Sequence, residues 1–120
     1  MTLSSLQADL AAFARERDWE QFHTPKNLAM ALVGEAGELA AEFQWLTPEQ
    51  AFAVMNEPDR AQAVQHEMAD VFSYLLRLAD VLEVDLEQAL RDKIAVNAAK
   101  YPVELAHGNA AKYTRWEEGT

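Results

Sequence analysis

The sequence predicts an all-α protein, and two observations carry that prediction. Only four glycines and four prolines interrupt the 120 residues. The stretches between them are rich in Ala, Leu, Glu and Gln, which are good helix formers, and no segment alternates apolar and polar residues as a strand does. Because short connectors make neighbouring helices antiparallel, we expect an antiparallel four-helix bundle.

The first helix is expected over residues 3–15, because apolar side chains recur there at steps of three and four. They form one face: Leu3, Leu6, Leu10, and Phe13 or Ala14. A polar and aromatic connector follows at residues 18–23. Thr24 and Pro25 then form a helix start, with threonine as the N-cap and proline at the first helical position. The second helix should run from there to about Leu46.

The same start signal recurs at Thr47 and Pro48, where Gln50 is placed to complete a capping box. We expect a short helix there, ended by residues 56–59. A third long helix is expected over residues 59–82. Its apolar residues follow steps of four and three, which is the pattern of a bundle seam: Val64, Met68, Val71, Leu75, Leu78 and Leu82.

Asp85 is placed to cap a fourth helix. This helix should end near Tyr101 and Pro102, because proline disfavours the helical conformation in the residue before it. The remaining chain is polar and contains glycine. We therefore expect one helical domain over residues 1–105 and a polar C-terminal tail over residues 106–120.

Charge and composition exclude several classes of protein. The chain carries 20 acidic against 10 basic side chains, a net charge of -10, which disfavours stable nucleic-acid binding and anionic membranes. The absence of cysteine excludes disulfide frameworks, thiolate zinc sites and cysteine nucleophiles. No apolar run approaches the roughly 20 residues that span a bilayer, and the N-terminus lacks the pattern of a signal peptide. We expect a cytoplasmic protein.

Acidic residues occupy helix positions where core residues are expected. The seam of the second helix reads Leu28, Leu32, Glu35, Leu39, Glu42 and Leu46. Glu38 lies about 60° from Glu35 around that helix, so Glu35, Glu38 and Glu42 share one face. On the third helix, Glu67 and Asp70 lie beside the apolar seam at the same spacing of three residues.

These acids have two interpretations that the residues alone leave open. Burying an ionised carboxylate is tolerated only with a partner, a metal or a shifted pKa, and only Arg60 lies between Lys26 and Arg77 to neutralise them. Mg²⁺, which prefers oxygen ligands, would fit. Alternatively, the acids form a solvated or partner-facing surface. Gly34 and Gly37 flank the glutamates, which indicates either close approach by a ligand or another backbone, or tight helix packing.

The two acidic pairs match a family signature. Glu35 with Glu38 and Glu67 with Asp70 resemble the E-x-x-E and E-x-x-D motifs of the MazG-like nucleotide pyrophosphohydrolases. Flanking strings extend the likeness over roughly residues 10–114: residues 17–23, 85–86, 100–103 and 112–114, with Lys93 and Asn97.

The resemblance implies Mg²⁺-dependent hydrolysis of a (deoxy)nucleoside triphosphate to its monophosphate and pyrophosphate, with Mn²⁺ as a possible substitute. The likeness is greatest to members that act on dCTP or modified dCTP and cleanse the nucleotide pool. It matches the metal ligands to Glu35, Glu38, Glu67 and Asp70. Family members assemble as dimers or tetramers with shared sites, so the resemblance implies a homodimer or homotetramer.

The resemblance also assigns substrate-binding positions. Those around the base and sugar are Trp19, His23, Trp45 and Tyr74. Those near the phosphates or the deoxyribose are Lys93, Asn97, Lys100 and Tyr101. A glutamate that the metal does not fully engage would align or deprotonate the attacking water. We expect this residue to be Glu38, with Glu35 as the second candidate.

Three alternatives compete with this function. A di-iron carboxylate bundle needs two Glu-x-x-His motifs on helices, and the one such string, Glu20 to His23, lies in a connector. A non-catalytic helical protein would use its acidic seam to bind a basic partner. A MazG-like enzyme for another nucleotide would differ only in its base pocket, which the sequence places loosely.

Overall fold

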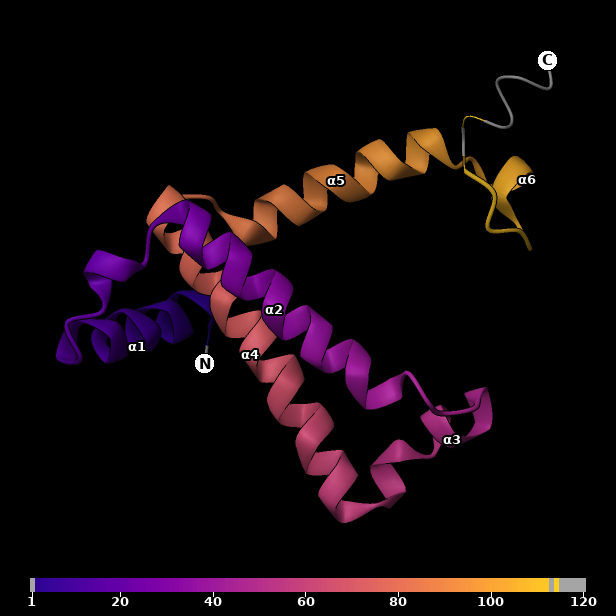
Figure 1. The fold of residues 1–120 in the computed structure, drawn as a ribbon. Helices are drawn as coiled ribbons and strands as arrows, with labels where there is room; N and C mark the ends of the chain where they lie inside the picture. Colours follow the sequence, from indigo (N-terminus) through magenta and orange to yellow (C-terminus); the bar gives the residue numbers. More distant parts are fainter. Residues whose placement is uncertain (1, 113, 115–120) are drawn as a thin grey trace. The chain divides into compact units, whose positions relative to one another are not determined.

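The computed structural model describes residues 2–112 and 114, and every regular element among them is helical (Figure 1). The predicted all-α class is therefore confirmed. The chain divides into two compact units, Met1–Val84 and Asp85–Thr120, which we describe separately. Within the described residues, no helix is both long enough and apolar enough to cross a membrane.

The first unit is built on three long helices. Figure 1 shows α2 and α4 side by side and antiparallel, with α3 in the connection between them. α1 packs against α4. In chain order the elements are α1 (Leu3–Glu16), a 3₁₀ turn (Glu20–Phe22), α2 (Pro25–Phe43), α3 (Pro48–Phe52), a second 3₁₀ turn (Val54–Asn56) and α4 (Pro58–Leu82).

The predicted helix starts are confirmed by their capping bonds. Thr24 accepts a hydrogen bond from the backbone N–H of Asn27 at 3.3 Å. Thr47 and Gln50 form the predicted capping box, with bonds of 2.9 and 3.2 Å. The expected end of α2 at Leu46 is wrong by three residues. The chain leaves α2 through a turn in which the backbone N–H of Leu46 donates to the carbonyl of Phe43 at 3.0 Å, and it is extended at the N-cap Thr47.

The predicted seam of the third long helix is wrong at three positions. The exposed fractions are 56, 37 and 51% for Met68, Leu75 and Leu82. Beside this seam, the half-buried Glu67 has a carboxylate oxygen within 4.8 Å of those of Glu35 and Glu38 on α2. The contact between α2 and α4 therefore includes polar side chains beside the apolar seam of α4.

The core of the first unit is small. Gln7 ties α1 to α4, because its side-chain amide donates to the carbonyl of Leu76 at 3.0 Å. Leu28 and Leu76 are almost fully enclosed, and burial of a leucine side chain contributes about 1.5–3 kcal/mol. The buried hydrophobic residues are Ala14, Leu28, Val54, Ala61, Val64, Leu76 and Ala79.

The second unit contains α5 (Leu86–Lys100) and one further turn, α6 (Val103–Ala106), which the sequence did not predict. Asp85 caps α5 as expected, accepting from the backbone N–H of Gln88 at 3.0 Å. The boundary between a domain and a tail at residue 105 stays a prediction, because residues 113 and 115–120 lie outside the described part of the chain.

Candidate metal and substrate site

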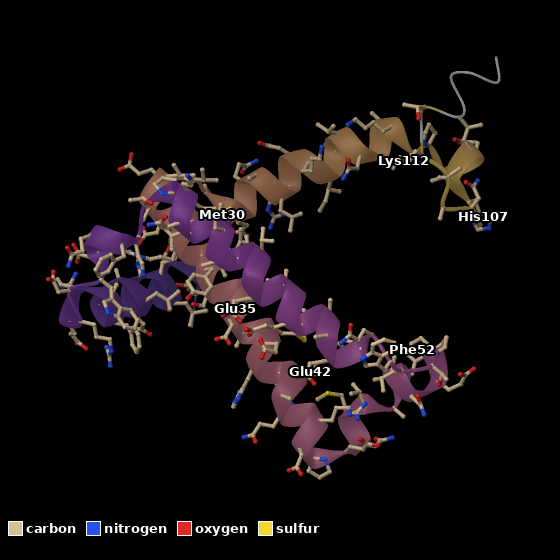
Figure 2. The ribbon with its side chains drawn as sticks, viewed as in Figure 1. Met30, Glu35, Glu42, Phe52, His107 and Lys112 are labelled. Atoms are coloured by element: carbon tan, nitrogen blue, oxygen red, sulfur yellow. The ribbon has the colours of Figure 1, made fainter. Side chains whose placement is uncertain are left out.

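Three acidic side chains meet between α2 and α4. Glu35 and Glu38 come from α2 and Glu67 from α4, and each offers a carboxylate oxygen within 4.8 Å of the other two. Figure 2 shows Glu35 on the stretch of α2 that runs beside α4. Glu35 and Glu67 are half-buried, whereas Glu38 is exposed. Three of the four predicted metal ligands thus lie together.

Two oxygens of this acidic cluster have no partner. Oε2 of Glu35 and Oε2 of Glu67 are buried and accept no hydrogen bond within the described residues. Arg60, the lysine or arginine nearest to Glu67 in sequence, pairs instead with Glu57 at 3.4 Å. Leaving a buried polar atom unsatisfied is unfavourable. A hard divalent cation takes carboxylate oxygens as ligands, so the residues present fit a metal site.

The cluster also shifts proton affinities. The pKa of Glu35 is raised to about 7. The largest cause is a hydrogen bond with Glu38 that Glu35 can make only when it is protonated, followed by burial and by the negative charges of Glu38 and Asp70. Burial is the main cause that raises the pKa of Glu67, followed by its interaction with Glu38. Both shifts reflect carboxylates that repel one another in partial isolation from water.

Asp70, the fourth predicted ligand, is exposed and lies three residues after Glu67 on α4. It is not among the three residues whose oxygens lie within 4.8 Å. It lines the same cavity as Glu35, and its negative charge is one cause of the raised pKa of Glu35. Its role as a ligand therefore stays a prediction.

A cavity of about 290 Å³ adjoins the acids. Ligand pockets commonly measure about 300–1,000 Å³, so this one suits part of a nucleotide. Three predicted substrate-binding residues, Trp19, His23 and Tyr74, share it with two predicted metal ligands. The full lining is Leu10, Phe13, Trp19, His23, Glu35, Asp70, Ser73, Tyr74 and Arg77.

The end of α1 sets the position of Trp19. Asp18 adopts a left-handed conformation, with φ of 55°, and the backbone N–H of Trp19 donates back to the carbonyl of Ala14 at 2.9 Å. This is a Schellman motif. It brings the indole edge-on to Phe13, with ring centroids 5.8 Å apart. The guanidinium of Arg17 lies 3.6 Å from the centre of that phenyl ring.

His23 is held by α4. Its Nδ1 accepts a hydrogen bond from Nε of Arg77 at 3.1 Å. Burial lowers the pKa of His23, and the charge of Arg77 lowers it further, while Glu20 acts in the opposite direction. The imidazole is therefore biased towards its neutral form.

Comparison with known proteins supplies the family. Residues 31–115 match the model of the MazG-like family. The chain belongs to this family. Its match begins just before the acidic pair of α2 and includes all of α4 and α5.

Named relatives cover almost the whole chain. It is 47% identical over 119 residues to dCTP pyrophosphatase 1 of Mus musculus, covering 99% of this chain and 70% of the mouse protein. The Homo sapiens protein of that name is 45% identical over 118 residues, covering 98% and 69%.

A solved structure agrees in fold. The crystal structure of a pyrophosphatase from Archaeoglobus fulgidus DSM 4304 superposes with a TM-score of 0.77 at 39% identity. The match covers 82% of this chain and 91% of the archaeal one. This MazG-like chain is therefore a nucleoside triphosphate pyrophosphohydrolase, and the comparisons do not support a non-catalytic acidic protein.

The remaining predicted residues of the MazG-like site come from the end of α2 and from the second unit. Trp45 follows the end of α2, is 86% exposed and is not among the residues that line the cavity beside the acids. The predicted phosphate and sugar positions belong to the second unit, on α5 and at its end. Their roles stay predictions: Lys93, Asn97, Lys100 and Tyr101.

Two glycines of the MazG-like motif have open surroundings. A Cβ atom at Gly34 or Gly37 would meet nothing within 4 Å. Tight helix packing within the first unit is therefore excluded as their explanation. Close approach by a ligand or by another backbone remains open.

Sequence reasoning missed Arg77 and Ser73, which line the cavity. A signal for Arg77 was present, because Asp70, Tyr74 and Arg77 follow one another at steps of four and three and so share one face of α4. Phe13 was expected only as an apolar residue of the first helix. Nothing in its own spacing indicated a role beside Trp19.

Proposed function

We propose that this protein hydrolyses dCTP, or a modified dCTP, between the α- and β-phosphates to give dCMP and pyrophosphate. The observation that carries the proposal is the acidic cluster, with its two unpartnered oxygens, next to the cavity of Trp19, His23 and Tyr74. The relatives named dCTP pyrophosphatase support the choice of base.

The cation in this proposal is Mg²⁺, with Mn²⁺ as a substitute. The four acids would hold it through oxygen atoms alone, which is the ligand set that Mg²⁺ prefers: Glu35, Glu38, Glu67 and Asp70. When bound, it would offset the negative charges of the carboxylates and of the substrate phosphates. Glu35 and Glu67 contribute the buried oxygens that lack a partner.

Glu38 is the proposed base for the attacking water, with Glu35 as the second candidate. The exposure of Glu38 at the edge of the cluster supports this order. Glu35 and Glu67, in contrast, each have a buried oxygen to give to the cation. A positioned general base contributes about 10²–10⁴-fold to a rate.

The resemblance to the family assigns the substrate groups in this proposal. The base stacks on Trp19, an interaction worth about 1–3 kcal/mol, with His23 and Tyr74 beside it. The groups proposed for the phosphates and the deoxyribose come from α5 and its C-cap: Lys93, Asn97, Lys100 and Tyr101. Trp45 would complete the base site from its exposed position.

The active form is proposed to be a homodimer or homotetramer. Large apolar side chains are widely exposed on the single chain, where Trp45 and Phe52 are 86 and 93% exposed and Val33 is 67% exposed. A second copy of the chain would remove such surface from water. The exposed position of Trp45 is consistent with a site shared between subunits.

The first experiment identifies the bond and the base. The purified protein is incubated with Mg²⁺ and a panel of dNTPs and NTPs that includes 5-substituted dCTP, and pyrophosphate is resolved from orthophosphate. We expect dCMP and pyrophosphate from dCTP, with slower turnover of CTP. Orthophosphate as the sole inorganic product would exclude the proposed bond, and preference for another base would exclude dCTP as the substrate.

A matched pair of variants tests the base. Glu38→Gln should lower kcat by about 10²–10⁴-fold with unchanged helix content by circular dichroism. Glu42→Gln is the control, because Glu42 is a half-buried glutamate four residues further along α2 and outside the acidic cluster. Full activity in Glu38→Gln would remove Glu38 from the mechanism.

A further inference from the structure

Arg77 connects two parts of the cavity wall that are 54 residues apart in sequence. Its side chain extends from α4 and is only 12% exposed. Its Nε donates to Nδ1 of His23 at 3.1 Å, and its Nη1 donates to Oδ2 of Asp80 at 3.4 Å. Both Arg77 and His23 line the cavity beside the acidic cluster.

This bond fixes which nitrogen of the imidazole carries hydrogen. A guanidinium only donates hydrogen bonds and keeps its protons in proteins. Nδ1 of His23 must therefore be the unprotonated, accepting nitrogen. A neutral imidazole with a bare Nδ1 has its hydrogen on Nε2. Nε2 has no hydrogen-bond partner among the described residues.

We infer that Arg77 is a positioning residue that holds His23 as the neutral, Nε2-protonated tautomer, so that His23 donates a hydrogen bond to an acceptor atom of the substrate. The choice of acceptor rests on the proposed function. On cytosine it would be the 2-carbonyl oxygen or the ring N3, rather than the exocyclic amine, which is itself a donor.

The surroundings explain why such a device is needed. Glu20 on the connector, Glu35 on α2 and Asp70 on α4 place negative charge around the ring or in its cavity. Carboxylates favour a doubly protonated imidazolium. The positive charge of Arg77 and the partial burial of His23 oppose this protonation. The imidazole is thus kept as an uncharged donor in an acidic cavity.

The tautomer matters for substrate binding because it decides whether Nε2 of His23 donates or accepts a hydrogen bond. With the hydrogen on Nδ1, Nε2 would become an acceptor and would face a carbonyl oxygen with a lone pair. Loss of one such hydrogen bond lowers affinity by about ten-fold. Without Arg77 we therefore expect a KM about ten-fold higher, with kcat largely retained.

The direct test is the tautomer itself, read by long-range ¹H–¹⁵N NMR correlations of the histidine side chains in the purified 120-residue chain. The chain has three histidines, so a His23→Gln variant assigns the signal. We expect a protonated Nε2 and a bare Nδ1 in the parent protein. Arg77→Met should give a mixed or doubly protonated ring, and Arg77→Lys, which can still donate to Nδ1, should restore the parent pattern in part.

Arg60→Met is the matched control, because Arg60 also lies on α4 and forms an ion pair with Glu57 at 3.4 Å. It should change neither the His23 signal nor KM. If Arg77→Met does not fold, Arg77→Leu takes its place, because leucine also lacks a donor for Nδ1. A parent ring protonated on Nδ1, or a ring that is unchanged in the folded variant without a donor, would overturn the inference.

Kinetics separate this inference from the proposed function. The NMR test needs no turnover, so an inactive parent protein would contradict the proposed function and leave the tautomer to be judged by its spectrum. In an active protein, Arg77→Met should raise the KM for dCTP while Arg60→Met does not. An altered tautomer with an unchanged KM would refute the role in substrate binding.

Discussion

Glu35 and Glu67 illustrate a conflict between stability and function at single residues. Their carboxylates lie close to each other and to Glu38, and one buried oxygen of each has no partner. The folded chain therefore bears a repulsion that an unfolded chain does not. Such sites are typical of function, because local rules of stability are violated where chemistry requires it.

The first prediction follows from that repulsion. Without metal, Glu35→Gln should unfold at a higher temperature than the parent protein. Because the pKa of Glu35 is raised from 4.5 to about 7 in the folded state, its stabilising contribution is complete below about pH 4.5 and is lost as the pH rises through about 7. The advantage of the variant should therefore grow over that interval.

Thermal unfolding in EDTA at several pH values measures this effect, with Glu42→Gln as the control. Adding Mg²⁺ should stabilise the parent protein and Glu42→Gln but should stabilise Glu35→Gln much less. A variant that is less stable than the parent at neutral pH without metal would contradict the repulsion.

At the scale of the secondary-structure element, the C-terminal end of α1 determines the position of Trp19, which lines the cavity. Asp18 has a positive φ, a conformation that aspartate tolerates better than most residues and glycine tolerates best. Its side chain also accepts a hydrogen bond from Gln21 at 3.1 Å. The turn then brings Trp19 to Phe13.

Two substitutions at this turn should differ in their effects on stability and on KM. Asp18→Gly should retain stability and KM, because glycine adopts the same backbone conformation without strain. Asp18→Val should lose about 1–2 kcal/mol of stability and raise KM by displacing Trp19. Chemical denaturation and steady-state kinetics measure both quantities. Equal behaviour of the two variants would show that the backbone turn does not position the indole.

Local chemistry explains which elements could be predicted. Thr24, Thr47 and Asp85 each begin a helix with a bond that reaches only three residues along the chain, so the residues themselves encode the start. The packing face of α4 could not be predicted in the same way, because its apolar ridge and its acidic side lie next to each other. The contact of Arg77 with His23 spans 54 residues and has no local signal.

At the scale of the whole molecule, the core is small compared with the apolar surface that remains exposed. Among residues 2–112 and 114, seven hydrophobic residues are buried, while side chains as large as Trp45, Phe52 and Met30 are 86, 93 and 64% exposed. Exposed apolar surface of this kind is typical of a chain that associates.

We predict that sedimentation equilibrium will give a mass of two or four times the 13.5 kDa of one chain. Phe52→Asp should lower this mass or make it depend on concentration, while the exposed charge change Glu49→Lys on the same short helix should not. A parent protein that sediments as a single chain at micromolar concentration would contradict the proposed assembly.

The two unpartnered oxygens lie on different helices, Glu35 on α2 and Glu67 on α4. A cation held by both would therefore act as a crosslink within the antiparallel helix pair. Without it, the pair should open more often at this point, and the backbone amides on either side should exchange their hydrogens faster. The hydrogen-exchange rates of the individual amides along α2 and α4 would then report the fraction of the site that the cation occupies, without any nucleotide being consumed.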